Sequence, residues 1–209
     1  MSETATLFIV SAASGAGKTS LVKALLEKDN KILVSVSHTT RAARPGEEHG
    51  KDYFFVDKAQ FASMVEAGDF IEHAQVFDNF YGTAESEVRR MLADGIDVIL
   101  EIDWQGAQQV RKLFKEAVSI FIIPPSKQEL KNRLQGRGQD SDEIIQRRMQ
   151  DAVSEMSHYV EFDYLIVNDD FDLALEQLSH VVGSQRLLAV HQANNLQSLL
   201  QDLLATTAD

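Results

Sequence analysis

The sequence predicts an α/β fold built around a parallel β-sheet. Apolar segments of β-type residues recur at 7–10, 32–36, 96–102, 118–123 and 163–167. They are continuously apolar rather than alternating, which is typical of strands covered on both faces in a parallel sheet. Helical patterns separate most of them, at 18–28, 86–93, 104–114, 126–136, 142–159 and 171–204. Alternation of this kind is the pattern of α/β proteins.

Composition narrows the classes of protein that fit. A chain of 209 residues is long enough for one sizeable core with inserted subdomains. The formal net charge of −12 argues against a nucleic-acid partner, which requires a basic surface. Cysteine is absent, which excludes disulfides and thiolate metal sites. We find no apolar stretch of membrane-spanning length and no signal-peptide pattern at Met1, so we expect a cytoplasmic protein without a membrane partner.

The first strand leads directly into a glycine-rich loop, Ala-Ala-Ser-Gly-Ala-Gly-Lys-Thr at 12–19, and then into the first helix. Glycines let consecutive backbone N–H groups converge on a phosphate, and the helix N-terminus adds its positive dipole end. Lys18 supplies a cation, and the hydroxyl of Thr19 stands where such loops hold Mg²⁺. Ala12 occupies a position where the common pattern has glycine. This context predicts a site for a nucleoside triphosphate.

A second group of phosphate-binding residue types follows the next strand. Arg41 and Arg44 lie three apart in 35–47, among serine and threonine hydroxyls. The planar guanidinium suits bidentate recognition of phosphate, although an Arg-x-x-Arg loop is also common on solvated surfaces. Hydroxyls of Tyr53, Tyr81 and Thr83 are available to complete such a site. These residues favour a second bound phosphate near the C-terminal ends of the strands.

Glu72 follows the apolar pair Phe70-Ile71. A carboxylate in a small pocket can accept hydrogen bonds from N1–H and the exocyclic amine of guanine, a donor pair that adenine lacks. A site built around these bonds rejects an analogue that cannot make them. Glu72 is therefore a candidate base-reading residue.

The strand at 96–102 ends in two acids, Glu101 and Asp103, at spacing i, i+2. In a strand these side chains share one face, so both can point toward a bound metal or substrate. The alternative is that they cap the strand end and the following helix. Because a phosphate loop is present in the same chain, we favour a role for these two acids beside the metal.

Two insertions interrupt the α/β pattern. Residues 51–84 read as a small β-rich unit with one helix around 58–67, and 126–158 is helical and rich in arginine. Arg137 lies between Gly136 and Gly138 at an expected hinge, where a mobile arginine can close over a transferring phosphoryl group. We interpret Arg147 instead as part of a salt-bridged helix face.

The C-terminal helical pattern places one stripe of leucines on a single face, and we expect this face to pack on the core rather than form a coiled coil. The stripe consists of Leu196, Leu199, Leu200, Leu203 and Leu204. The histidines are scattered without a ligand-like pair, which indicates structural or surface roles.

Taken together, these motifs resemble the guanylate kinase family from Ile9 to about Phe171. The resemblance rests on eight blocks: 14–19, 36–47, 50–55, Phe-Ile-Glu at 70–72, Tyr-Gly-Thr at 81–83, Ile-Asp-Trp-Gln-Gly at 102–106, Gly-Arg-Gly at 136–138 and Ile-Val-Asn-Asp-Asp at 166–170. It implies the P-loop nucleoside monophosphate kinase fold, a parallel sheet flanked by helices. It also implies a core of 5–36, 85–125 and 159–207, a β-rich GMP-binding region at 37–84 and a helical lid at 126–158.

The resemblance further implies transfer of the γ-phosphoryl group of ATP to GMP, with Mg²⁺ as cofactor and Thr19 on the metal. The implied catalytic residues are Lys18, Arg41, Arg137 and Arg148. The implied ATP-binding residues are Ala12, Ala13, Ser14, Gly15, Ala16, Gly17, Lys18, Thr19, Ser20, Arg133 and Asn168. The implied GMP-binding residues are Ser37, Arg41, Arg44, Tyr53, Glu72, Tyr81, Thr83, Glu101 and Asp103. The family often has aspartate at the position of Glu101.

Two alternatives of other kinds stay open at this point. Guanylate-kinase-like domains of scaffold proteins bind peptides without catalysis, but they typically lose the loop lysine that this chain keeps as Lys18. A related kinase could act on another phosphate monoester, such as a phosphorylated ribose, although Glu72 and Thr83 favour a base. The sequence does not decide between GMP and dGMP as the acceptor, and it is compatible with a homo-oligomer.

Overall fold

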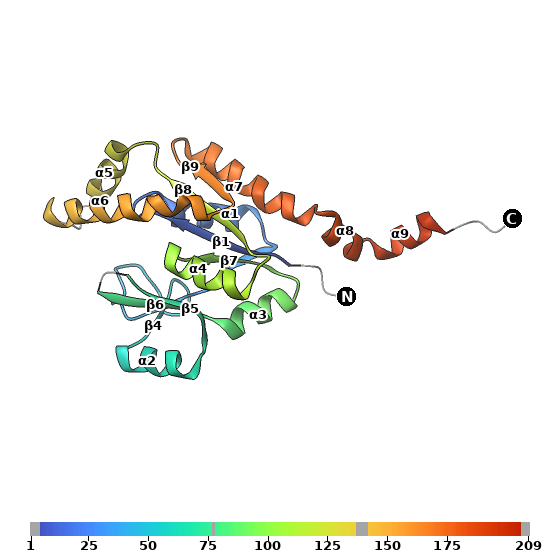
Figure 1. Ribbon diagram of the computed structural model, residues 1–209, viewed down its shortest axis with the longest axis horizontal. Helices are drawn as coiled ribbons and strands as arrows, with labels where there is room; N and C mark the ends of the chain where they lie inside the picture. The colour runs from blue at the N-terminus through green and yellow to red at the C-terminus, as the bar shows by residue number, and fades with distance from the viewer. Residues whose placement is uncertain (1–4, 77, 137–141, 206–209) are drawn as a thin grey trace.

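Five strands form the central sheet of the computed structural model, which describes residues 5–76, 78–136 and 142–205 (Figure 1). Their order is β2-β7-β1-β8-β9, and every neighbouring pair is parallel. The strands are β1 (Leu7–Ala12), β2 (Ile32–Val34), β7 (Asp97–Glu101), β8 (Val118–Ile123) and β9 (Tyr164–Val167). The predicted parallel sheet is confirmed, with β2 shorter than its apolar segment.

Helices cover both faces of this sheet. Phe8 and Val10 of β1 point into a core shared with α1 (Lys18–Lys28) and α7 (Phe171–Arg186). Leu7 and Ile9 point the other way, against α3 (Glu85–Ala93) and α4 (Trp104–Leu113). Side chains alternate along a strand, so a strand between two helical layers needs apolar residues at every position. This explains why the strand segments of the sequence are continuously apolar.

A second sheet, with order β4-β3-β6-β5, lies beside the first (Figure 1). It contains β3 (His38–Thr39), β4 (Phe54–Phe55), β5 (Phe70–Val76) and β6 (Asn79–Ala84), with α2 (Lys58–Ala67) between β4 and β5. The helix of this insertion is confirmed. The sheet begins earlier than the expected 51–84, because β3 pairs with both β4 and β6.

Side-chain hydrogen bonds fix the small sheet to the core. The amide of Gln109 on α4 accepts from the His73 N–H at 3.1 Å and donates to the His73 carbonyl at 2.8 Å. Gln109 thereby satisfies both backbone groups of a residue in β5. This contact joins α4 of the core to β5 of the small sheet.

Two helices follow β8, namely α5 (Lys127–Gly136) and α6 (Asp142–Ser157), and a 3₁₀ turn, η1 (His158–Glu161), leads on to β9. Leu130 and Leu134 of α5 pack with Ile145 and Ala152 of α6 and with Ala13 of the glycine-rich loop. Both helices therefore rest on the loop that follows β1. The predicted hinge arginine, Arg137, lies outside the described residues.

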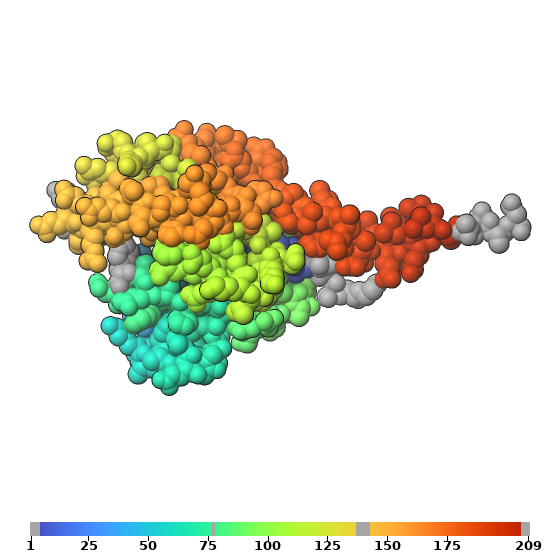
Figure 2. Space-filling model, viewed as in Figure 1, coloured from blue at the N-terminus to red at the C-terminus, as the bar shows by residue number. Residues whose placement is uncertain are grey.

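The prediction of one C-terminal helix packed on the core is wrong. The segment forms α7, α8 (Ala189–Asn195) and α9 (Gln197–Leu204), and the last two project from the body (Figure 2). Leucines of the stripe are 37% to 78% exposed. Val182 is the last buried residue of α7, so the chain has already passed the core where α8 begins. Within the described part of the chain, no helix combines the length and apolar character needed to cross a membrane.

Candidate active site

The loop between β1 and α1 has the backbone conformation of an anion site. Gly15 and Gly17 adopt φ of 92° and 97°, a region that strongly favours glycine. Gly17 is the N-cap of α1, so the first N–H groups of the helix face the loop. Ala12 ends β1 with extended backbone, which any residue adopts, so glycine is not required there.

Two side chains from distant segments hold this loop from outside the cleft. The Asn168 amide donates to the Ala16 carbonyl at 2.7 Å, and the Asn168 side chain is buried. Arg133 donates to the Asn168 carbonyl at 2.9 Å and to the Ala16 carbonyl at 3.4 Å. A Cβ at Gly17 would overlap the Asn168 amide nitrogen. Close packing of Asn168 therefore adds a second reason for glycine at 17.

Lys18 and Thr19 place a cation and a hydroxyl at the start of α1. The Lys18 ammonium donates to the Ile102 carbonyl at 3.3 Å, and burial lowers its pKa against the opposing effect of Glu101 and Asp103. The Thr19 hydroxyl donates to the Glu101 carboxylate at 3.0 Å. Hydroxyl and carboxylate oxygens beside a phosphate loop are suitable ligands for Mg²⁺. The pair Thr19–Glu101 therefore fits the predicted metal position.

Asp103 lies two residues after Glu101 and has a local structural role. Its carboxylate accepts from the Gly106 N–H at 2.9 Å and from the Gln105 amide at 3.1 Å. It is thus the N-cap of α4, as the alternative interpretation of this acid anticipated. Asp103 nevertheless also lines the cleft described below.

Glu72 occupies a buried position where the small sheet meets α4. Its side chain is 3% exposed, and it accepts a hydrogen bond of 2.6 Å from the Thr83 hydroxyl. The strand register shifts between Phe70 and Glu72, and this bulge brings Glu72 opposite Thr83. The Ser37 hydroxyl lies 3.1 Å from that of Thr83. A Cβ at Gly106 would come within 2.6 Å of Glu72 Oε2, so Gly106 is needed for this close approach.

Burial raises the pKa of Glu72 to about 7, because desolvation penalises the ionised form. The Thr83 hydrogen bond opposes this shift, and the negative charge of Asp103 reinforces it. A carboxyl group that titrates near neutral pH in a cleft is a strong candidate for ligand recognition. It can accept two hydrogen bonds from a ligand only when ionised.

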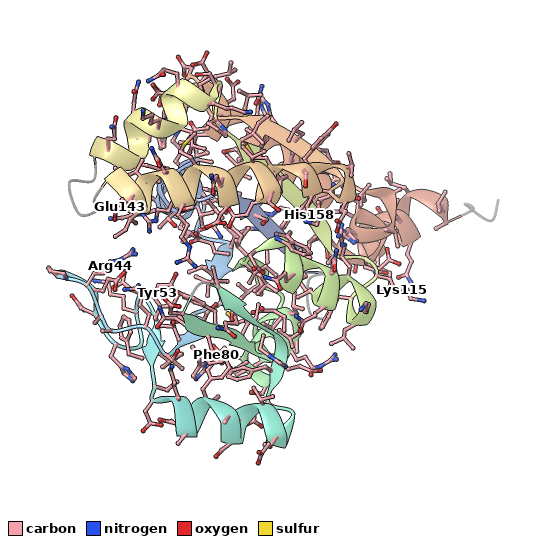
Figure 3. The ribbon with its side chains drawn as sticks, turned by 60° about the vertical axis from the view of Figure 1, so that its left-hand side comes forward. Arg44, Tyr53, Phe80, Lys115, Glu143 and His158 are labelled. Atoms are coloured by element: carbon pink, nitrogen blue, oxygen red, sulfur yellow. The ribbon has the colours of Figure 1, made fainter. Side chains whose placement is uncertain are left out.

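Arg41 faces the cleft from the loop after β3. Its guanidinium donates to the Glu47 carboxylate at 2.8 Å and lies 5.3 Å from the centroid of the Tyr53 ring. Glu47 also accepts from the Arg44 N–H at 2.7 Å. Glu47 thereby orients the Arg41 guanidinium and holds the backbone of Arg44. Figure 3 shows Arg44 and Tyr53 on the small-sheet side, facing α6.

One cleft of about 560 Å³ brings the predicted groups together. Its lining includes Ala12, Ala13, Ser14, Gly15, Gly17, Lys18, Thr19, Ser20, Ser37, Arg41, Arg44, Tyr53, Glu72, Tyr81, Glu101, Asp103 and Arg148. Residues of the phosphate loop, the small sheet and α6 thus share one space. Their roles as ligand contacts stay predictions.

Some predicted residues lie elsewhere. The phosphate loop is held from behind by hydrogen bonds from Arg133 and Asn168 to the Ala16 carbonyl. The Thr83 hydroxyl contacts Glu72 and Ser37, which line the cleft. Arg147, interpreted as part of a surface helix face, borders the cleft.

Glu155 of α6, which no sequence motif indicated, lines the cleft and accepts from the Ser14 N–H at 3.0 Å. Glu47 was likewise not predicted as a functional residue, although it stands in the motif with Arg41. Its position three residues after Arg44 could have indicated a carboxylate that pairs with the arginines.

Known proteins resemble this chain over most of its length. The family model "Guanylate kinase" matches residues 4–185. A guanylate kinase of Saccharophagus degradans is 60% identical over 98% of this chain and 100% of its own length, and one of Hahella chejuensis is 58% identical over 96% of each. The crystal structure of guanylate kinase from Anaplasma phagocytophilum superposes with a TM-score of 0.78 at 35% identity, over 97% of this chain and 96% of the other.

Proposed function

We propose that this chain, which belongs to the guanylate kinase family, phosphorylates GMP with ATP and divides its cleft between the two nucleotides. In this proposal, the phosphate loop and α1 bind ATP, the small-sheet region 37–84 binds GMP, and the segment 126–158 closes over both. The products are ADP and GDP. The cellular role is the return of GMP to the nucleotide pool.

The observation that carries the GMP half is the buried pair Glu72–Thr83, 2.6 Å apart, in the same cleft as Lys18. An ionised Glu72 would accept from guanine N1–H and the exocyclic amine. Thr83 fixes the orientation of the carboxylate. Adenine offers no matching donor pair, and a site with buried polar groups rejects a ligand that leaves them unpaired.

Arg41, Arg44, Ser37, Tyr53 and Tyr81 would hold the GMP phosphate. Glu47 holds the Arg41 guanidinium beside the Tyr53 ring. An arginine held in place loses less side-chain entropy when it binds phosphate.

On the donor side, Lys18 would neutralise charge on the ATP phosphates, and Arg137 and Arg148 would cover the transferring group. Thr19, with Glu101 beside it, would hold Mg²⁺, which supplies Lewis-acid stabilisation of the phosphate oxygens when bound. The attacking oxygen of GMP is already an anion, so no strong general base is needed. Catalysis then consists of positioning and electrostatic stabilisation, without a covalent intermediate.

The direct test is formation of ADP and GDP by the purified protein with Mg·ATP and a panel of GMP, dGMP, AMP, IMP and UMP. We expect GMP to be preferred and AMP and UMP to be very poor acceptors. Absence of GMP-dependent ADP formation would overturn the proposal. Equal rates with GMP and AMP would overturn the assignment of Glu72.

A further inference from the structure

Helix α6 presents two adjacent faces to the rest of the molecule. One face packs against α5 and the phosphate loop, through Ile145, Met149, Ala152 and Met156. The neighbouring face lines the cleft, through Ile144, Arg148 and Glu155. Residues of one face recur at three, four or seven positions along a helix, so rotation of α6 about its axis would move both faces together.

Glu155 joins α6 directly to the phosphate loop. Its Oε2 accepts from the Ser14 N–H at 3.0 Å, a contact between residues 141 positions apart in the chain. Burial raises the pKa of Glu155, with the charges of Asp103 and Asp151 in the same direction, while the Ser14 hydrogen bond and the Lys18 ammonium oppose the shift. This hydrogen bond fixes one point on the cleft-facing side of α6 to the loop that binds phosphate.

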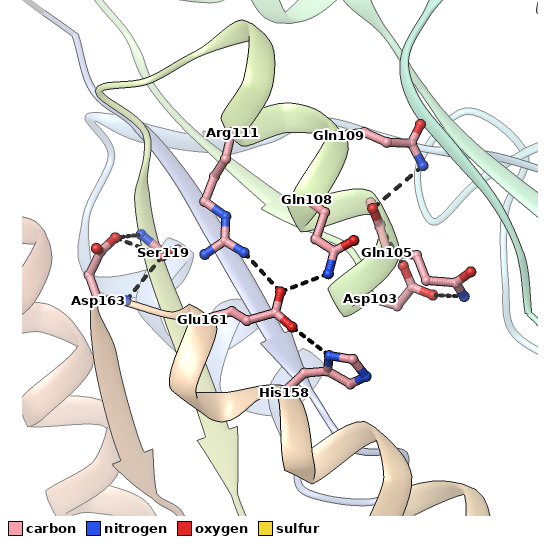
Figure 4. A network of polar contacts seen from close by, with 10 residues as sticks. Asp103, Gln105, Gln108, Gln109, Arg111, Ser119, His158, Glu161 and Asp163 are labelled. Atoms are coloured by element: carbon pink, nitrogen blue, oxygen red, sulfur yellow. Dashed lines mark hydrogen bonds and ion pairs between the residues drawn. The ribbon is translucent and has the colours of Figure 1, made fainter.

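The C-terminal end of α6 is fixed to the core by a separate network (Figure 4). The His158 ring stacks on Trp104 of α4, with ring centroids 3.6 Å apart, and its Nδ1 lies 2.6 Å from the Glu161 carboxylate. Glu161 also accepts from the Gln108 amide at 2.8 Å and pairs with Arg111 at 3.3 Å. This anchor fixes the end of α6, while its apolar face and the Glu155 contact hold the helix further along its length.

We propose that Glu155 is a positioning residue for the proposed phosphoryl transfer: its hydrogen bond to Ser14 sets the rotation of α6 that directs Arg148 toward the phosphate loop. Arg148 precedes Glu155 by seven residues, so the two lie on one face about 10 Å apart along the axis. A fixed point at Glu155 therefore determines the direction of Arg148. The inference rests on the proposed role of Arg148 in that transfer.

An opposite role for Glu155 makes opposite predictions. As an anion beside the phosphate loop, it could occupy the place of a nucleotide phosphate and inhibit binding. Its removal would then lower the KM for ATP and raise turnover. The positioning role instead predicts a loss of kcat, because a small misplacement of a catalytic group can cost up to about 100-fold.

The test compares Glu155→Gln with Glu155→Met in steady-state assays of ADP formation. Glutamine keeps an acceptor oxygen for the Ser14 N–H, and methionine has similar volume without one. We expect Glu155→Met to lower kcat by about 10- to 100-fold with little change in the KM for GMP, and Glu155→Gln to stay within about 3-fold of wild type. Gln150→Ala, exposed on the same helix, is the matched control and should leave kcat unchanged.

A double-mutant cycle with Arg148→Ala separates positioning from a general structural effect. Arg148→Ala should lower kcat much less in the Glu155→Met background than in wild type, because the arginine is already misdirected there. Independent, multiplicative losses, a faster Glu155→Met variant, or equal losses in the two Glu155 variants would overturn the inference. A wild-type protein without GMP-dependent activity would instead overturn the proposed function.

Discussion

Replacement of Glu72 by glutamine tests guanine recognition with little change of shape. The amide oxygen can still accept from Thr83, whose hydroxyl lies 2.6 Å from Oε1 in the native protein. The amide nitrogen, however, replaces an acceptor by a donor at the position that we propose faces the guanine donors. The variant therefore removes one charge-assisted hydrogen bond and places two donors against each other.

The expected magnitude follows from the burial of this site. Hydrogen bonds to charged groups contribute about 1.5–3 kcal/mol, which corresponds to a loss of about 10- to 100-fold in kcat/KM for GMP. The KM for ATP should change little, since Glu72 lies in the small sheet and accepts its hydrogen bond from Thr83 of the same sheet. The ratio of GMP to IMP activity should also fall, because IMP lacks the exocyclic amine.

The assay is ADP formation with GMP and IMP varied at saturating Mg·ATP, for both proteins, from pH 6 to 8. Burial raises the pKa of Glu72 to about 7, so protonation removes the acceptor as pH falls. The wild-type KM for GMP should rise toward pH 6, and that of Glu72→Gln should lack this rise. Equal losses for ATP and GMP, or the same pH dependence in both proteins, would refute this reasoning.

Three further predictions concern stability and the phosphate loop. The pKa of Glu72 is raised from 4.5 to about 7, so its contribution to the free energy of unfolding falls as pH rises through this range. Glu72→Gln should therefore be more stable than wild type at pH 8 by about 1–3 kcal/mol, but not at pH 4. Calorimetric melting at both pH values measures this difference, and a gain at pH 4 alone would contradict it. Gly17→Ala should abolish ATP-dependent thermal stabilisation, because φ is 97° and the new methyl group overlaps Asn168, whereas Gly46→Ala, at φ 89° with no atom within 4 Å of its Cβ, should keep it. Leu203→Ala on the exposed α9 should change the free energy of unfolding of the monomer by less than about 0.5 kcal/mol, whereas Leu178→Ala, at a buried position, should lower it by about 2–5 kcal/mol. Urea titrations measure both values, and similar losses in the two variants would show that α9 packs on the core.

Features that depend on local sequence could be predicted well. The phosphate loop follows from glycines at fixed spacing between an apolar strand and a helix, and Gly15 and Gly17 have the backbone that this spacing requires. Continuous apolar segments likewise predicted strands covered on both faces. The placement of Glu72 in a pocket was inferred from its apolar neighbours, and its side chain is buried.

Features that depend on tertiary packing could not be predicted in the same way. The leucine stripe of α9 has the same periodicity whether or not another element covers it, so the pattern did not reveal its exposure. The contact of Glu155 with Ser14 depends on the rotation of α6, which no local motif encodes. The two-residue strand β3 is too short for a periodic signal.

The central claim is that one cleft holds both nucleotides, with the guanine end at Glu72 and the adenine nucleotide on the phosphate loop. Binding of a ligand that joins adenosine and guanosine through five phosphates tests this claim most directly. Occupation of both halves at once should make its affinity at least about 100-fold higher than that of ATP, and both ATP and GMP should displace it. An affinity no higher than that of ATP, or displacement by ATP alone, would contradict the claim.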